Sequence, residues 1–293
     1  MTGLGRALEA ALEQALGARV SRSSRLSGGD INDAFEIALC DGRRVFVKTN
    51  RQAPDGMFAA EARGLRWLAS AGSLRVPRVL AVSSGGAEGG AEFLALELLD
   101  PAPRRACFDE ELGRGLAALH ASGAPSFGLD HDNFIGSLPQ SNRSHATWPE
   151  FFRAERLEPQ LRRAEREGRV GSSLLRAFDR LYGKLPELVG PPEAPARLHG
   201  DLWGGNLHVD EAGAPCLIDP AAYAGHREVD LAMMRLFGGF SERVFAAYAE
   251  SHPLAPGHAE RVPLYQSYPL LVHVNLFGGG YARSVEAVLA RYV

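Results

Sequence analysis

The sequence is poor in cysteine and has no long apolar run. Its three cysteines, Cys40, Cys107 and Cys216, form neither a CxxC pair nor a cluster with histidine that would bind a metal, so we expect reduced thiols. No uninterrupted apolar stretch reaches the roughly 18 residues of a membrane-spanning helix, and the amino terminus lacks the basic and apolar regions of a secretory signal. We therefore expect a cytoplasmic protein without a membrane partner.

The chain also lacks an excess of either charge. It has 32 basic and 35 acidic side chains, and its formal net charge is -3. A balance of this kind gives no general attraction to nucleic acid or to anionic lipid. We expect a small or protein-borne neutral substrate, and no nucleic-acid partner.

The residues that are present predict two lobes. The chain has 293 residues, of which 45% are hydrophobic, and this length suits two lobes of roughly 100 to 200 residues each. Short apolar runs and glycine turns before residue 100 predict strands, whereas helical periodicity dominates afterwards. The sequence therefore predicts an α+β fold with a small β-rich N-lobe (residues 1–100) and a larger, mostly helical C-lobe (residues 101–293).

The clearest functional signal lies in the C-lobe. Residues 199–206 read HGDLWGGN, and residues 216–220 read CLIDP. Phosphoryl transfer from ATP needs a carboxylate that accepts the proton of the acceptor hydroxyl, and oxygen ligands that hold Mg²⁺ on the phosphates. We assign Asp201 as this base, and Asn206 and Asp219 as the metal ligands.

The spacing of these residues favours a two-lobed protein-kinase-like fold. In protein kinases the asparagine of the catalytic loop follows the aspartate by five residues, as Asn206 follows Asp201 here, and a second aspartate comes later. Gly-Asp and Gly-Asn pairs also occur in ordinary turns. The apolar run before Asp219, together with the spacing, favours the catalytic interpretation.

The N-lobe offers candidates for nucleotide binding. Lys48 ends an apolar strand, as does the kinase lysine that binds the α- and β-phosphates, and Glu61 in the next helix can pair with it. Gly28 and Gly29 stand in a turn between the first two strands, where backbone N–H groups would cover the phosphates. Two adjacent glycines also occur in ordinary hairpin turns, so the turn alone is a weak signal.

Adenine is expected to bind between the two lobes. The apolar run from Phe93 to Leu98 reaches the point where a kinase joins its lobes. The main-chain groups of Glu97, Leu98 and Leu99 are our candidates for contact with adenine. A plain core strand would look the same, because such contacts use no side chain.

Several motifs resemble the fructosamine-3-kinase family. Residues 198–206 (LHGDLWGGN) resemble the LHGDLWSGN signature of that family, and residues 218–221 (IDPA) resemble its metal-binding segment. The other similar segments extend over nearly the whole chain: 132–136, 139–142, 225–232, 237–240 and 275–281. The resemblance implies a fold related to aminoglycoside phosphotransferases.

The resemblance also implies a reaction. ATP, with Mg²⁺, would phosphorylate the C3 hydroxyl of ketoamines formed when sugars glycate lysine, and loss of the unstable phosphate would free the amine, which is deglycation. Ribulosamines are the preferred substrates on this ground, and we expect a monomer. The substrate contacts that the resemblance favours are Trp203, Asn133, Gln140, Asn142 and Phe277. Trp203 could instead anchor the core, and the polar loop could face solvent.

Two other functions remain open from the sequence. The chain could be another small-molecule kinase of this fold, acting on an aminoglycoside, choline or homoserine. It could also be a pseudokinase that only binds a partner, although all five catalytic and nucleotide-binding polar residues are retained. The arginine-rich run 153–169 alternates with glutamates and is predicted to be a solvated helix face.

Overall fold

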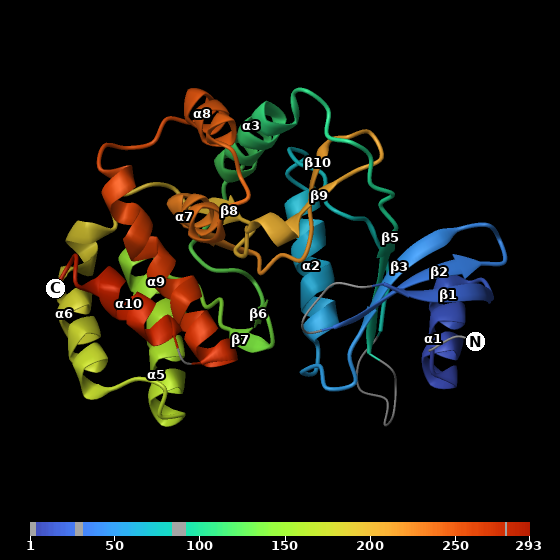
Figure 1. The fold of residues 1–293 in the computed structure, drawn as a ribbon, viewed down its shortest axis with the longest axis horizontal. Coiled ribbons are helices and arrows are strands. Elements are labelled where there is room, and N and C mark those ends of the chain that lie inside the picture. Colours follow the sequence, from blue (N-terminus) through green and yellow to red (C-terminus); the bar gives the residue numbers. More distant parts are fainter. Residues whose placement is uncertain (1–3, 27–31, 84–91, 279) are drawn as a thin grey trace.

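The computed structural model describes residues 4–26, 32–83, 92–278 and 280–293. A β-sheet flanked by helices forms one side of the molecule, and a larger helical part forms the other (Figure 1). The five-stranded sheet is antiparallel, with strands in the spatial order β1-β2-β3-β5-β4. Its strands are β1 (Val20–Leu26), β2 (Asp33–Leu39), β3 (Arg44–Thr49), β4 (Val79–Val82) and β5 (Phe93–Glu97).

One helix covers each face of the sheet. Helix α1 (Arg6–Leu16) buries a leucine stripe against one face, and α2 (Met57–Ala69) packs on the other (Figure 1). Side chains of a strand point alternately to the two faces. In β5, Phe93 and Ala95 accordingly pack with α1, whereas Leu94 and Leu96 pack with α2.

The rest of the described chain is mainly helical. Its helices are α3 (Phe108–Ala121), α4 (Trp148–Phe151), the π-helical segment η1 (Phe152–Leu157), α5 (Glu158–Arg166), α6 (Ser172–Leu188), the 3-10 turn η2 (Gly204–Asn206), α7 (Glu228–Phe237), α8 (Glu242–Ser251), α9 (His258–Phe277) and α10 (Tyr281–Leu289). A large apolar core joins α4, α5, α6, α9 and α10, and a second core joins α3, α7 and α8 to α2. None of the described helices combines the length and the apolar character needed to span a membrane.

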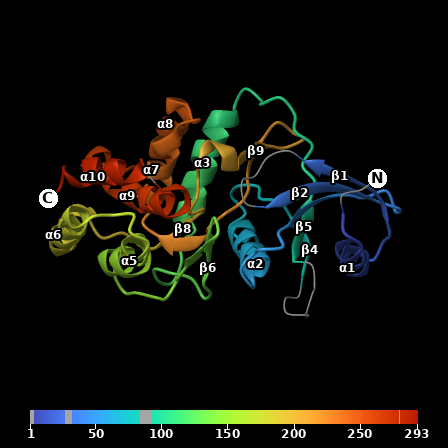
Figure 2. The ribbon, with the colours of Figure 1, turned by 60° about the horizontal axis from the view of Figure 1, so that its bottom comes forward.

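Three short strand pairs lie between the sheet and the helices. They are β6 (Asn133–Ile135) with β7 (Leu138–Gln140), β8 (Ala196–Leu198) with β11 (Tyr223–Gly225), and β9 (Leu207–Val209) with β10 (Pro215–Leu217). Strand β6 lies beside α2 in both views (Figures 1 and 2). The loops that leave β8 and β10 carry the polar motif of the sequence.

The change from strands to helices falls near residue 100, between β5 and α3. The division into lobes at residues 1–100 and 101–293 itself stays a prediction. One local prediction is wrong in part, because Arg156 and Glu155 of the arginine-rich run are buried rather than solvated. Arg162 and Arg163 do lie on the expected face and pair with glutamates four residues away.

Candidate active site

A cavity of about 1350 Å³ separates the sheet from the helical part. Both parts contribute to its lining, and the catalytic, metal-binding and nucleotide-binding candidates that the structure describes all line it: Lys48, Glu61, Glu97, Leu98, Leu99, Asp201, Asn206 and Asp219. Gly28 and Gly29 lie outside the described residues. Groups that are far apart in sequence therefore converge on one space.

Hydrogen bonds of the Asn206 and His199 side chains help to fix the loop 199–206. Asn206 Nδ2 donates to the backbone oxygen of Asp201 at 2.9 Å and to its Oδ2 at 3.2 Å. His199 Nε2 lies 2.9 Å from the backbone oxygen of Ile218, and its Nδ1 lies 3.3 Å from the backbone nitrogen of Asp201. Burial lowers the pKa of His199, so its neutral ring can donate to Ile218 and accept from Asp201. The His199 ring therefore stabilises the conformation of the loop.

Gly200 allows this loop to pack against the chain that follows Asp219. Its φ of +83° lies in the left-handed region, which favours glycine. A Cβ atom at this position would lie 2.1 Å from the backbone oxygen of Ala221. The two loops that carry Asp201 and Asp219 are therefore in direct backbone contact.

The environment of Asp201 suits a general base. Burial raises the pKa of this carboxyl to about 7, the negative charges of Asp219 and Asp230 act in the same direction, and the hydrogen bond from Asn206 opposes them. General bases are most effective when their pKa lies near the working pH. The Asp201 carboxyl can therefore exchange a proton at neutral pH.

Lys48 lies between two carboxylates. Its Nζ is 2.8 Å from Glu61 Oε1 and also contacts Asp219 Oδ1. Burial by itself would lower the pKa of Lys48, but the charges of Asp219 and Glu61 raise it above its usual value. The side chain is 7% exposed, so Lys48 presents a fixed ammonium group to the cavity.

One side-chain oxygen on each of the predicted metal ligands, Asn206 and Asp219, remains available to a metal. Asn206 uses its Nδ2 within the loop, and neither its Oδ1 nor Asp219 Oδ2 makes a hydrogen bond to another described residue. Among the described residues, no group of three or more His, Cys, Asp or Glu side chains could hold a metal. Magnesium usually takes one or two protein oxygens and completes its shell with phosphates and water. The pair of oxygens fits that pattern.

The expected adenine site lies where β5 ends. Glu97 is the last residue of β5, and its Oε1 accepts a hydrogen bond from the backbone nitrogen of Arg78 at 3.0 Å. No hydrogen bond joins the backbone groups of Leu98 or Leu99 to another described residue. All three residues line the cavity, so the main chain after β5 can offer a donor and an acceptor to a ligand.

Three exposed aromatic side chains also line the cavity. Trp203, Phe237 and Phe277 are 41%, 42% and 58% exposed and all line it. Trp203 and Phe277 are predicted substrate contacts, whereas Phe237 was not predicted. The ring of His273 packs between the rings of Phe237 and Phe277, at 4.8 Å and 5.3 Å between centroids. Sugars commonly bind flat apolar surfaces of this kind through their C–H faces.

The three predicted polar contacts occupy a different environment. Asn133, Gln140 and Asn142 are 5%, 2% and 1% exposed, and only Asn133 lines the cavity. Their amide groups bond to one another and to backbone oxygens. The solvent-facing loop that we considered is therefore wrong. The substrate contacts of the three amides stay a prediction, although Gln140 and Asn142 do not line the cavity.

Asp230 is a site residue that the sequence interpretation missed. This fully buried carboxylate accepts the backbone N–H groups of His199 at 2.8 Å and Gly200 at 2.9 Å. Asp230 stands in the first turn of α7, some thirty residues after the loop that it holds. No local spacing marks such a contact, although an acidic residue in a first helical turn is a general hint.

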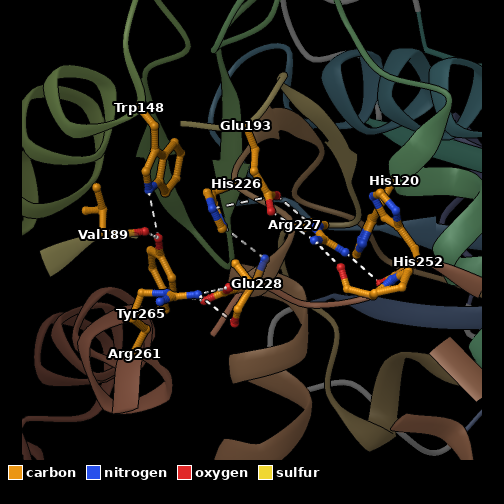
Figure 3. A network of polar contacts seen from close by, with 12 residues as sticks. His120, Trp148, Val189, Glu193, His226, Arg227, Glu228, His252, Arg261 and Tyr265 are labelled. Carbon is orange, nitrogen blue, oxygen red and sulfur yellow. Dashed lines mark hydrogen bonds and ion pairs between the residues drawn. The ribbon is translucent and has the colours of Figure 1, made fainter. Parts of the chain in front are cut away.

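Two ion pairs, of Arg227 with Glu193 and of Arg261 with Glu228, fix the start of α7, the helix that carries Asp230 (the pairs are shown in Figure 3). Arg227 binds both oxygens of Glu193, at 2.7 and 2.8 Å, and donates to the backbone oxygen of His252. The next residue, Glu228, accepts two hydrogen bonds from Arg261, at 2.8 and 2.6 Å. Paired contacts of this kind set orientation as well as distance.

Comparison with known proteins places these features in a family. The model of the family described as fructosamine kinase matches residues 5–293. A Synechocystis sp. protein named as a probable ketoamine kinase is 39% identical over 274 residues, which cover 92% of this chain and 90% of that protein. A chloroplastic protein-ribulosamine 3-kinase of Arabidopsis thaliana is 34% identical over 94% of this chain and 83% of its own length.

Solved structures agree with this assignment. A crystal structure from Thermobifida fusca, of a protein assigned as a fructosamine-3-kinase, has a TM-score of 0.88 and 38% identity, covering 98% of this chain and 99% of that one. An aminoglycoside phosphotransferase in complex with ADP and hygromycin B, at 20% identity and a TM-score of 0.63, shares the fold over 98% of this chain and 99% of its own. The predicted α+β kinase-like fold and the predicted resemblance are both confirmed, and the chain belongs to the fructosamine kinase family.

Proposed function

We propose that this protein is an ATP-dependent kinase that phosphorylates the C3 hydroxyl of ketoamines, namely ribulosamine and fructosamine adducts of lysine. The observation that carries the proposal is the convergence of Asp201, Asn206, Asp219 and Lys48 on one cavity. Relatives named as ketoamine and ribulosamine kinases support the substrate class. A pseudokinase is not favoured, because it would have no need to keep these four groups together.

The nucleotide end of the site uses the pair of Lys48 and Glu61. Glu61 holds the lysine ammonium at 2.8 Å, so that Lys48 can bind the phosphates of ATP. Adenine is assigned to the main chain of residues 97–99, and the glycine turn of Gly28 and Gly29 keeps its proposed place over the phosphates. Magnesium, held by Asn206 and Asp219, would neutralise the charge that develops on the phosphates.

Asp201 acts on the acceptor. Its carboxylate accepts the proton of the C3 hydroxyl while the hydroxyl oxygen bonds to the γ-phosphorus and the bond from that phosphorus to ADP breaks. Asn206 keeps the carboxylate in place through its bond to Oδ2, at 3.2 Å. The products are ADP and a 3-phosphoketoamine, whose breakdown would release the free amine and complete deglycation.

The acceptor end favours an uncharged sugar over a polycation. Trp203, Phe237 and Phe277 supply flat apolar surface. The described carboxylates that line the cavity already have proposed roles or partners: Glu61, Glu97, Asp201 and Asp219. An aminoglycoside carries several ammonium groups, which would need acidic partners there. We infer that ribulosamines and fructosamines are accepted and aminoglycosides are not, with ribulosamines preferred.

The test measures ADP formation with ribuloselysine, fructoselysine and kanamycin as acceptors, each with ATP and Mg²⁺. We expect turnover with the two ketoamines and little or none with kanamycin. Robust phosphorylation of kanamycin without turnover of either ketoamine would overturn the proposed specificity. Absence of turnover with all three acceptors would contradict the proposed activity itself.

A further inference from the structure

The buried amides of Asn133, Gln140 and Asn142 form one connected cluster, which we call the amide cluster. Gln140 Nε2 donates to Asn133 Oδ1 at 2.8 Å, and Asn142 Nδ2 donates to the same oxygen at 2.9 Å. All three side chains are at most 5% exposed. Buried amides are costly unless bonded, so a cluster that is bonded in this way has a defined geometry.

The amide cluster holds the backbone that follows Asp219. Asn133 Nδ2 donates to the backbone oxygen of Ala222 at 2.8 Å, and Gln140 Nε2 donates to that of Ala221 at 3.1 Å. The hairpin of β6 and β7 thus reaches across more than eighty positions of sequence to two consecutive peptide groups. These peptide groups begin two residues after the proposed metal ligand.

Asp219 itself needs such support. Its φ is +55°, and among the described residues it is the one non-glycine residue with positive φ. A side chain in this region is strained and persists only where the surroundings fix the backbone. The backbone oxygen of Ala221 also packs against Gly200. Restraint at Ala221 therefore acts on both Asp219 and the loop that carries Asp201.

Arg156 anchors the far side of the amide cluster. This arginine belongs to the π-helical segment, is fully buried, and forms no ion pair with a described carboxylate. It donates to Asn142 Oδ1 at 2.6 Å and lies 3.8 Å from the ring centre of Tyr223. A π-helical turn inside an α-helix often marks a functional region. The hydrogen bond from the Arg156 guanidinium therefore orients the amide group of Asn142.

We propose that Arg156 and the amide cluster are positioning residues for the magnesium site. They keep Asp219 in its left-handed conformation and so aim its carboxylate at the metal, and Gln140, Asn142 and Arg156 do not bind the sugar. The inference rests on the proposed function in that it takes Asp219 as a metal ligand. It replaces the expected substrate contacts of Gln140 and Asn142 with a role in metal binding.

The test uses Gln140→Met, which keeps the volume of the side chain and removes its bonds to Ala221 and Asn133. It also removes the bond that Gln140 Oε1 accepts from the Tyr268 hydroxyl. The matched control is Gln160→Met, because Gln160 is 5% exposed and accepts a hydrogen bond from Asn275 at 2.8 Å, in another part of the core. Calorimetry measures the binding of ADP with Mg²⁺ and with EDTA. Steady-state kinetics measures the Mg²⁺ concentration for half-maximal rate and the KM for ribuloselysine.

We expect Gln140→Met to weaken ADP binding in the presence of Mg²⁺ by about tenfold or more, since outer groups of metal sites commonly have effects of 10–100-fold. Binding of ADP in EDTA, and the KM for ribuloselysine, should stay within twofold of wild type. The control should match wild type in all these measurements. Arg156→Lys, which keeps the charge but loses the paired donors, should show the same pattern as Gln140→Met in a milder form.

A different pattern overturns the inference. A raised KM for ribuloselysine with unchanged Mg²⁺-dependent ADP binding would show that Gln140 contacts the sugar. Equal effects of Gln140→Met and Gln160→Met would show general destabilisation instead. Because ADP binding needs no acceptor, a protein that fails to phosphorylate ketoamines but shows the expected change in ADP binding would contradict the proposed function and leave this inference standing.

Discussion

Replacing Asp230 by asparagine tests how the loop 199–206 is held. The carboxylate accepts the N–H groups of His199 and Gly200 and lies 3.3 Å from His120 Nε2. In Asp230→Asn, the amide oxygen can accept from one backbone N–H while its NH₂ group faces the other. One buried donor is then left without an acceptor, and the loop loses the restraint at Gly200.

The structure gives the expected size of this effect. Hydrogen bonds to a charged group contribute about 1.5–3 kcal/mol each, so the loss of one bond and of the charge should cost about 2–4 kcal/mol of unfolding free energy. For a chain of this size, that corresponds to a melting temperature lower by about 3–7 °C. A loosened Gly200 should also move Asp201, and kcat should fall by about tenfold to a hundredfold.

The loss of unfolding free energy in Asp230→Asn should depend on pH. Burial alone would raise the pKa of Asp230, but hydrogen bonds and charge from His120 and the backbone hold it below its usual value. A carboxyl with a lowered pKa stabilises the folded state above its unfolded pKa of about 3.9, and this contribution is lost as the pH falls through the folded pKa. The difference in unfolding free energy between wild type and Asp230→Asn should therefore be full near neutral pH and shrink in acid.

The assay combines urea unfolding at several pH values with kinetics at a temperature where both proteins are folded. Asp210→Asn is the control at another buried carboxylate: Asp210 is 4% exposed, its Oδ1 accepts the N–H groups of Ala212 and Ala214 at 2.9 and 2.8 Å, and its Oδ2 pairs with Arg75. The control should lose comparable stability and keep its kcat. Wild-type kcat in folded Asp230→Asn, or an equal loss in both variants, would refute the role of Asp230.

Three other variants test separate contacts. Glu61→Gln should lower kcat/KM for ATP by about tenfold, because Lys48 loses its charged partner, and an unchanged value in steady-state kinetics would contradict the role of the pair. Gly113→Ala should lower the free energy of unfolding by about 1–3 kcal/mol, since its Cβ would lie 2.3 Å from the backbone oxygen of Val244. An unchanged melting temperature would refute the close packing of α3 on α8. Gly205→Ala should raise the KM for ribuloselysine but not for ATP, because its Cβ would lie 2.2 Å from the ring of Trp203. A KM for ribuloselysine equal to that of wild type would show that Trp203 does not contact the acceptor.

Most of the candidate active site could be predicted from the spacing of residues within short segments of the sequence. The fold and family predictions are confirmed, and Asp201, Asn206 and Asp219 all line the cavity, because their roles depend on short segments whose geometry is set nearby. Lys48 and Glu61 pair as expected, across a strand and the following helix.

Contacts between residues that are far apart in sequence could not be predicted from local spacing. Asp230 holds His199 from a distant helix, and a pattern of residue types cannot show that contact. The amides of Asn133 and Gln140 looked like the polar groups of a loop, but tertiary packing buries them. Arg156 was predicted on a solvated face because its neighbours alternate in charge, whereas Tyr223 and Tyr268, which lie against its guanidinium, come from segments far away in sequence.

The most direct test of the central claim follows ribuloselysine by mass spectrometry in the presence of ATP and Mg²⁺, with wild type and Asp201→Asn compared. Wild type should form a phosphorylated ketoamine and then free lysine. Asp201→Asn, shown to be folded and to bind ADP, should form the phosphorylated product at least about a hundredfold more slowly, because it lacks the general base. A folded Asp201→Asn protein that phosphorylates ribuloselysine at nearly the wild-type rate would contradict the account.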